Sequence, residues 1–257
     1  MQVGDFIELV VSCAPIRTQP SDISEMCTEA LAGEVAVVQE IGTKDWIRIQ
    51  LVGDDYEGWT DRKQWFFFHA GAAKHIGAKY FRVQSPVSPW LRPDGAVLQL
   101  PAGSIVSLGD DHSTWSLAGN DLSPLFPLDD VFQAHQSPLD AAQAFIGSPY
   151  RWGGRSVWGM DCSGLIQLAY VLCGKKLPRD ASQQALKGGL IHWVNRSPGD
   201  LVFFKNVSGG ITHVGILKTL DTIIHAAGEV RLDAMKEDGI WRDQTKTHSI
   251  SCIRRID

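Results

Sequence analysis

The stretch YRWGGRSVWGMDCSG, Tyr150–Gly164, concentrates glycines, tryptophans, an aspartate and a cysteine in one short segment. Glycine is unfavourable in the interior of a helix or a strand, so this segment is predicted to be a loop. Apolar residues recur at helical spacing from Leu165 to Leu172 directly after it, and Gly174 ends the run. The loop therefore delivers Cys162 to the first turn of a helix.

A cysteine in that position has a chemical use. The unpaired N–H groups and the positive end of the helix dipole favour a thiolate at Cys162, and the same N–H groups suit an oxyanion. Gly153, Gly154 and Gly159 let the backbone turn sharply and let a substrate approach without clashes. The loop is predicted to present a sulfur atom beside an open groove walled by aromatic side chains.

A thiol nucleophile needs a base, and two histidines are candidates. His213 lies in THVGIL and His225 lies in TIIHAAG, two strand patterns separated by a short turn around residues 218–221. Adjacent antiparallel strands place two imidazoles on one face as cross-strand neighbours. One histidine is then predicted to activate Cys162 while the other orients and polarises it.

The other thiols and imidazoles are predicted to be ordinary structural residues. The chain has five cysteines and no CxxC pair, which indicates reduced thiols. A zinc site built from Cys162, His213, His225 and Asp161 would lack any short ligand spacing, so neither a metal nor a cofactor is expected. Cys173 and Cys252 are expected in the core, and half-buried structural roles are expected for His69, His75, His112, His135, His192 and His248.

Composition limits the class of protein. The 257 residues are 44% hydrophobic and 21% charged, as in globular proteins, and the net charge of -5 argues against a nucleic-acid partner. The sequence contains no run of 18 apolar residues, so a transmembrane helix is not predicted. The N-terminal segment has no basic region and only a short apolar run, so a secretory signal is not predicted. A cytoplasmic location is expected, unless a signal has been removed.

Three segments differ in pattern. Residues 1–70 contain short β-type runs with turn signals about every 8–12 residues, which predicts a small all-β barrel, and residues 71–130 repeat this style. In the first segment, WIRIQLV alternates apolar and polar residues like a half-buried strand. Residues 123–138 are predicted to be a linker on the surface. Residues 131–257 place helices before a mainly antiparallel sheet, which indicates an α+β domain.

Five motifs carry a resemblance to a known family. SPYRWGG with MDCSGLIQLAY, then RDASQQ, PGDLVFF, THVGI and IIHA resemble, in this order, the NlpC/P60 cysteine peptidases of bacterial cell-wall metabolism. The match runs from about Ser137 to Asp257, and the preceding β segments resemble bacterial SH3 (SH3b) modules. The resemblance implies a papain-like domain after two SH3b-like barrels. It also implies Cys162 as nucleophile, His213 as base and His225 as the residue that orients the base.

The most similar architecture is the γ-D-glutamyl-L-diamino acid endopeptidase type, which implies a substrate pocket. The implied substrate is a murein peptide, L-Ala-γ-D-Glu-diamino acid with a free amine, cut after D-Glu without a cofactor. Asp161 would pair with the amine, although a helix N-terminal acid can instead satisfy backbone donors. The other pocket positions implied are Tyr150, Ser163, Ser182, Tyr56 and an SH3b acid, Glu25 with Glu29 as its rival.

Two other functions remain open at this stage. The same Cys–His site could serve an amidase, an acyltransferase or a hydrolase that remodels the wall. Alternatively, the SH3b segments could bind the wall while the peptidase domain is inert. The joint presence of Cys162, His213 and His225 argues against an inert domain.

Overall fold

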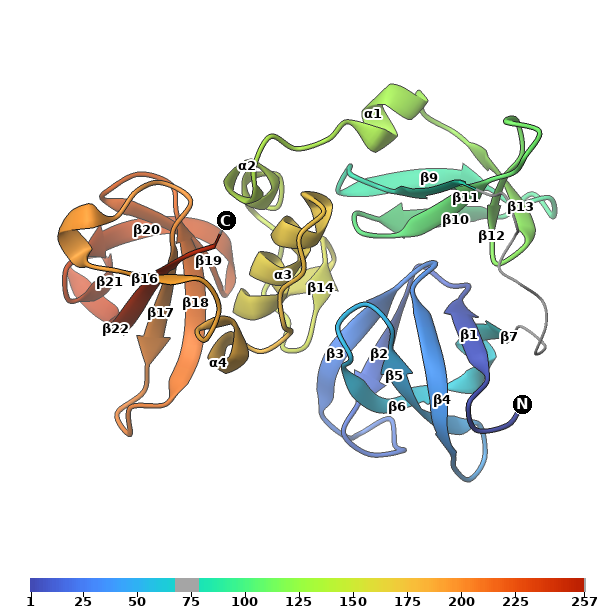
Figure 1. Ribbon diagram of the computed structural model, residues 1–257, viewed down its shortest axis with the longest axis horizontal. Helices are drawn as coiled ribbons and strands as arrows, with labels where there is room; N and C mark the ends of the chain where they lie inside the picture. The colour runs from blue at the N-terminus through green and yellow to red at the C-terminus, as the bar shows by residue number, and fades with distance from the viewer. Residues whose placement is uncertain (68–78, 257) are drawn as a thin grey trace. The chain divides into compact units, whose positions relative to one another are not determined.

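A computed structural model describes residues 1–67 and 79–256 (Figure 1). His69, His75 and the expected boundary between residues 70 and 71 lie outside the described residues. Backbone contacts divide the chain into two compact units. One unit comprises Met1–Ala134 and Arg155–Val157, and the other comprises His135–Gly154 and Trp158–Asp257.

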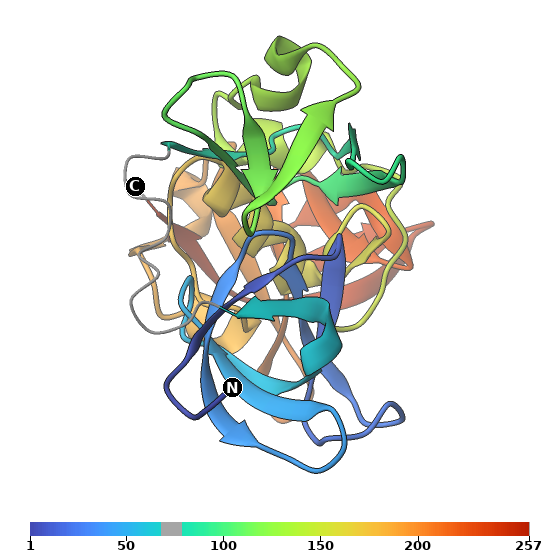
Figure 2. The same cartoon turned by 90° about the vertical axis from the view of Figure 1, so that its right-hand side faces the viewer.

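The first sheet of the N-terminal unit is antiparallel and strongly curved, as the blue to cyan strands show in Figure 2. Its spatial order is β3-β2-β6-β5-β4-β1-β7. The strands are β1 (Phe6–Leu9), β2 (Cys13–Arg17), β3 (Met26–Leu31), β4 (Val35–Ile41), β5 (Trp46–Leu51), β6 (Glu57–Asp61) and β7 (Trp65–Phe67), with the 3-10 helix η1 (Arg62–Gln64) before the last. The alternation predicted in β5 is confirmed, because Ile47, Ile49 and Leu51 are buried in one core while Arg48 is exposed.

A second sheet of the same unit has the order β10-β9-β13-β12-β11-β8. Its strands are β8 (Lys79–Arg82), β9 (Val87–Leu91), β10 (Val97–Pro101), β11 (Ile105–Leu108), β12 (Trp115–Leu117) and β13 (Asn120–Pro124). Trp90 and Trp115 meet edge to face in its core, with ring centroids 5.7 Å apart. This core is separate from that of the first sheet.

The segment 123–138 lies mostly on the surface, as its sequence suggested, but it is more than a plain linker. It contains the helix α1 (Leu128–Phe132), and Val131 is buried in the core of the second sheet. The ring of Phe132 stacks on Trp115 with centroids 5.1 Å apart. Burial of these two side chains outweighs the turn-forming prolines and aspartates around them.

The C-terminal unit combines short helices with a third sheet. The helices are α2 (Pro138–Gln143), α3 (Cys162–Leu172), α4 (Ala181–Gln184) and the 3-10 helix η2 (Trp193–Asn195). Two-residue strands, β14 (Arg155–Ser156) and β15 (Gly159–Met160), occur in the glycine-rich loop. The sheet strands are β16 (Gly189–Ile191), β17 (Leu201–Lys205), β18 (Ile211–Leu217), β19 (Thr222–Ala227), β20 (Glu229–Lys236), β21 (Gly239–Arg242) and β22 (Thr245–Arg255).

The third sheet closes on itself. Its order is β16-β22-β17-β18-β19-β20-β21, and β22 also pairs with β21. The long C-terminal strand therefore joins the two ends of the β17–β21 ladder and encloses an apolar core that includes Phe204, Met235 and Ile253. Closure leaves the strands β17–β21 without a free edge with which another chain could pair.

Helix α3 is the central helix of this unit. It packs against α2, β18 and β19, and all its residues except Val171 are buried. A helix that is buried on every side belongs to a core, so its first residue is held rigidly. None of the helices in the described ranges is long and apolar enough to cross a membrane.

Candidate active site

The glycine-rich loop leads into α3 as its sequence predicts. Asp161 is the N-cap residue, and its Oδ1 accepts a hydrogen bond from the backbone N–H of Gly164 at 2.7 Å. Gly153 has φ +76°, a left-handed conformation that favours glycine. A Cβ on Gly154 would lie 2.2 Å from the carbonyl oxygen of Gly159, so this position also requires glycine.

Cys162 is the first residue of α3 and is only 6% exposed. Its sulfur accepts hydrogen bonds from the backbone N–H groups of Val214 and Ser163. Val214 follows His213 on β18, so the thiol lies against the strand that carries the expected base. The two elements thus bring together residues that are about fifty positions apart in the sequence.

Backbone N–H groups at the helix start favour a thiolate at Cys162, as expected, but burial outweighs them in the resting protein. Burial, and after it the charge of Asp161, raise the pKa of the Cys162 thiol to about 11. The two backbone N–H groups and Arg179 lower this pKa, but by less. The resting cysteine is therefore a neutral thiol, and forming the nucleophile requires a base that takes its proton.

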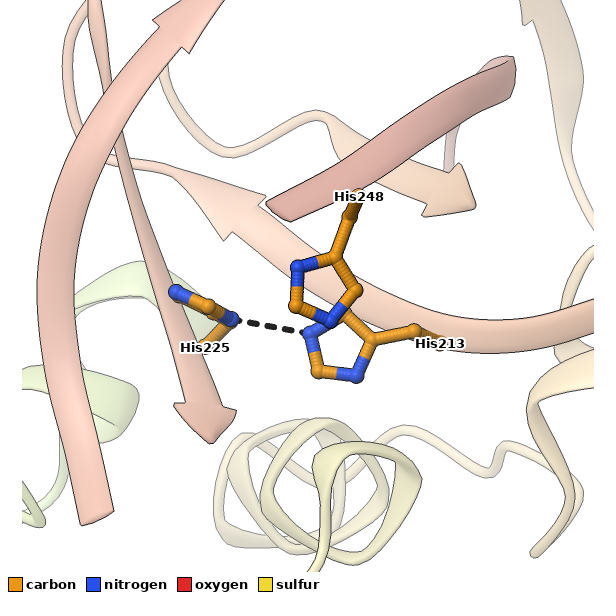
Figure 3. A group of neighbouring side chains, drawn as sticks. All are labelled: His213, His225 and His248. Carbon is orange, nitrogen blue, oxygen red and sulfur yellow. Dashed lines mark hydrogen bonds between the residues drawn. The ribbon is translucent and has the colours of Figure 1, made fainter. Parts of the chain in front are cut away.

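The two predicted histidines form a hydrogen-bonded pair, shown in Figure 3. His213 Nε2 and His225 Nδ1 are 2.8 Å apart. They are not directly opposite, because His225 pairs with Gly215 in the ladder. His213 lies two residues from Gly215, which puts both imidazoles on the same face as diagonal neighbours.

Burial keeps both imidazoles neutral at ordinary pH. It lowers the pKa of His213 well below its usual value, and the neighbouring His248 and His225 lower it further. Burial also lowers the pKa of His225 to about 4, although Asp233 partly opposes this effect. A neutral imidazole has the lone pair that a proton acceptor needs.

Two residues of this cluster were missed by the sequence reasoning. The first is Asp233 on β20, whose Oδ2 lies 2.9 Å from His225 Nε2. The second is the half-buried His248 on β22, whose ring stacks on that of His213 with centroids 4.2 Å apart. Asp233 could have been found, since Ala227-Gly228 marks a tight turn and alternation then places Asp233 on the face of His225. No local signal marks His248, because its position depends on the pairing of β22 with strands far away in the chain.

The three histidines could be considered as metal ligands. Ring nitrogens of His213, His225 and His248 all lie within 4.8 Å of one another. However, the rings of His213 and His248 are stacked with an interplanar angle of 23°, so their in-plane lone pairs do not converge on one point. Asp161, which the zinc alternative requires, is instead bonded to Arg179.

Asp161 and Ser163 are both placed at the start of α3, in contact with a buried arginine. Arg179, 1% exposed, donates from Nη1 to Asp161 Oδ1 at 2.9 Å and from Nη2 to Oδ2 at 2.6 Å. Its Nη1 also donates to Ser163 Oγ at 2.9 Å. The backbone N–H of Gly153 donates to Asp161 Oδ2. The carboxylate that was expected to bind a substrate amine is therefore occupied by protein donors, and its binding role stays a prediction.

Arg179 was missed although it begins the RDASQQ motif. A second residue of this motif, Gln184, is fully buried and donates from Nε2 to the backbone carbonyls of Ser163 and Pro178. Ser182, by contrast, is exposed on α4. The motif thus anchors the segment around α4 to the start of α3, and the predicted pocket role of Ser182 stays a prediction.

The remaining predicted pocket residues lie in different places. Tyr150 is half-buried, and its pKa is raised to about 12 by burial and then by the nearby Cys162. In the N-terminal unit, Tyr56 packs against the core of the first sheet and Glu25 is exposed. Glu29 is buried and accepts a hydrogen bond from the backbone N–H of Arg155. The binding roles of these residues stay predictions.

The other expectations for cysteines, histidines and tryptophans have mixed outcomes. All five cysteines are free thiols, but Cys173 and Cys252 are half-buried rather than in the core. His135 is half-buried, whereas His112 and His192 are exposed. The tryptophans of the glycine-rich loop, Trp152 and Trp158, are 59% and 40% exposed, and an aromatic wall around the substrate stays a prediction.

Together, the fold and the site supply a helix-start thiol and two hydrogen-bonded imidazoles, the groups that a thiol hydrolase uses. The sequence model of the NlpC/P60 family matches residues 147–249, and that of the "Bacterial dipeptidyl-peptidase Sh3 domain" matches residues 16–64. The chain therefore contains an NlpC/P60 domain, the domain of a family of peptidases, and a bacterial SH3 domain. The predicted fold class, an α+β papain-like domain preceded by SH3b-like barrels, is confirmed.

Three known proteins illustrate the likeness. A probable endopeptidase of Corynebacterium glutamicum is 43% identical over 91 residues, which covers 35% of this chain and 42% of that protein. A γ-D-glutamyl-L-lysine dipeptidyl-peptidase of Bacillus cereus is 26% identical over 239 residues, which covers 80% of this chain and 68% of that protein. The crystal structure of an NlpC/P60 family protein from Bacillus cereus superposes with a TM-score of 0.82 at 20% identity, covering 97% of this chain and 99% of that chain. This last likeness shows the shared fold.

Proposed function

We propose that this protein is a cysteine endopeptidase that hydrolyses the bond between the γ-carboxyl of D-Glu and the diamino acid in murein peptides. The observation that carries the proposal is the helix-start thiol of Cys162, which is bonded to the backbone N–H of Val214, the residue after His213 in the hydrogen-bonded pair His213 and His225. The name of the Bacillus cereus relative, which matches most of this chain, supports the choice of bond.

The reaction follows from the protonation states of the site. His213 takes the proton of the neutral Cys162 thiol as sulfur attacks the carbonyl carbon, and backbone N–H groups at the start of α3 stabilise the oxyanion. The imidazolium then protonates the leaving amine, which leaves a thioester on Cys162. Water attacks the thioester, His213 accepts the proton of that water, and the thiol is restored as the dipeptide acid departs.

We further propose that the enzyme requires a free N-terminal L-Ala amine. Stem peptides attached to glycan have an acylated L-Ala nitrogen, so such an enzyme would act in recycling of released peptides, in the cytoplasm. The SH3b acid proposed to pair with this amine is Glu25, with Glu29 as its rival; Glu25 is exposed and Glu29 is buried.

The test is mass spectrometry of digests of L-Ala-γ-D-Glu-diamino acid, with the free or the acetylated amine. Acetylation removes the charge that would pair with a buried carboxylate, so kcat/KM is expected to fall by about a hundredfold or more. Cys162→Ala should abolish hydrolysis of both peptides while leaving the Tm close to that of the wild type.

Other outcomes discriminate between the candidates. Equal kcat/KM for the two peptides would contradict the amine requirement and favour a hydrolase that remodels the wall. Cleavage of a different amide, absent in Cys162→Ala, would favour an amidase. Full activity of Cys162→Ala would exclude the thiol mechanism, and binding to cell walls without any hydrolysis would favour an inert peptidase domain.

A further inference from the structure

The carboxylate of Asp233 continues the line of hydrogen bonds that starts at His213. Asp233 lies on β20, is 9% exposed, and its Oδ2 is 2.9 Å from His225 Nε2. Arg231 Nε donates to the same oxygen at 3.0 Å, and Arg231 Nη1 donates to the backbone carbonyl of Ala227. The guanidinium is thereby held in place beside the carboxylate of Asp233.

An ionised carboxylate only accepts hydrogen bonds, which decides the direction of the whole line. His225 Nε2 must carry the hydrogen that Asp233 accepts, so a neutral His225 has its lone pair on Nδ1. His213 Nε2 must then carry the hydrogen of the 2.8 Å bond to His225 Nδ1. The lone pair of a neutral His213 is consequently left on Nδ1. Without the carboxylate, the reverse direction is equally allowed, and it puts a hydrogen on Nδ1 of His213.

We infer that Asp233 is a positioning residue that fixes the tautomers of His225 and His213 and leaves Nδ1 of His213 as the proton acceptor for Cys162. This inference rests on the proposed roles of Cys162 and His213 in the proposed function. Asp233 touches neither the thiol nor any substrate atom, and it acts through His225. Its negative charge also favours the imidazolium that forms at His213 when the thiol loses its proton.

The charged and titratable groups that face His213 come from several elements. They are His225 on β19, Arg231 and Asp233 on β20, and His248 on β22, while Cys162 on α3 is bonded to the backbone of the next residue, Val214. Arg231 and His248 disfavour a positive charge on His213, and Asp233 is the acid among these groups. Removing its charge should therefore move the protonation of the histidine pair to lower pH.

The experiment compares Asp233→Asn with the wild type in kcat, KM and the pH profile of kcat/KM. The amide retains the shape and loses the charge, and its NH2 group can donate to His225 Nε2, which a carboxylate cannot do, so the direction of the line is no longer fixed. We expect kcat to fall about 10- to 100-fold, KM to change little, and the acidic limb of the profile to move to lower pH. Asp233→Ala should lower kcat further than Asp233→Asn does, and Asp233→Glu should have a higher kcat than Asp233→Asn.

Asp243→Asn is the matched control, because its carboxylate is 94% exposed and the charge change is the same. Its left-handed backbone, φ 47°, also suits asparagine. The inference is overturned if Asp233→Asn has the kcat and pH profile of this control. It is also overturned if Asp233→Asn lowers both kcat and the Tm but leaves the acidic limb of the pH profile in place, since a purely structural role would have these effects.

A second readout separates this inference from the proposed substrate. The rate of Cys162 alkylation by iodoacetamide, followed by peptide mass spectrometry against pH, requires no substrate. If the wild type fails to cut the tripeptide but Asp233→Asn shifts the pH dependence of alkylation, the substrate proposal is wrong and the role of Asp233 stands. An unchanged alkylation profile in Asp233→Asn would contradict the role of Asp233 whatever the substrate.

Discussion

Asp161 connects three parts of the site through one carboxylate. It caps α3 through Gly164, holds the glycine-rich loop through the N–H of Gly153, and forms two hydrogen bonds with Arg179. Because Arg179 is almost fully buried, its charge has no access to water and depends on this partner. The residue before the nucleophile is therefore a structural support of the site.

Asp161→Asn is expected to lower the free energy of unfolding by about 3–5 kcal/mol, because it removes the carboxylate charge that pairs with the buried guanidinium of Arg179. Urea denaturation followed by circular dichroism measures this loss. Glu57→Gln breaks the exposed pair Arg48–Glu57 and should cost less than about 1 kcal/mol. A variant of Asp161 with wild-type stability, and with a loss of activity only on peptides with a free amine, would show instead that Asp161 mainly serves as a substrate ligand.

The glycine-rich loop, as an element, is a tight turn that positions the start of α3. Gly154 passes so close to Gly159 that a Cβ would meet the carbonyl oxygen at 2.2 Å, and backbone atoms cannot move aside as a flexible side chain can. The composition that made this loop unsuitable for a helix or a strand is therefore required by its packing.

Gly154→Ala is expected to cost about 1–3 kcal/mol of stability and to lower kcat, since the clash displaces the loop that ends at Cys162. Thermal unfolding and steady-state kinetics of the variant test both effects. Gly189→Ala is the control, because nothing lies within 4 Å of its Cβ and its φ is not in the left-handed region. Equal effects of the two substitutions would contradict the close approach at Gly154.

At the scale of the whole molecule, the buried histidines link stability to pH. His225 is fully buried, and its pKa of about 4 in the folded protein is below the value of about 6.5 in the unfolded chain. Between these two values the unfolded chain binds more protons, so stability falls as the pH is lowered. His213 acts in the same direction, because its pKa is also lowered by burial.

We therefore expect the free energy of unfolding to fall by at least about 2 kcal/mol between pH 7 and pH 5, where most carboxylates stay ionised. Urea denaturation at the two pH values measures the change. His225→Gln should reduce the pH dependence, whereas His192→Gln, at an exposed position, should leave it unchanged. The same pH dependence in His225→Gln and in the wild type would contradict this linkage.

The sequence by itself determined the features that local patterns encode. Alternation along residues 46–51 and the helical run after Cys162 set which faces are buried, and the glycines preceding Cys162 set where the helix begins. The THVGI and IIHA motifs lie on adjacent strands, so the pairing of His213 with His225 could be predicted. Asp233 could have been predicted in the same way, because the turn at Gly228 starts the next antiparallel strand.

Only the tertiary structure decided the features that depend on burial and on distant pairing. The pKa of Cys162 is raised because packing buries the first turn of α3, an effect that outweighs the local N–H groups. His248 reaches His213 because β22 closes the sheet, and Phe132 reaches Trp115 because a second core accepts it. Desolvation and long-range contacts are set by the whole fold, so no local spacing of residues specifies them.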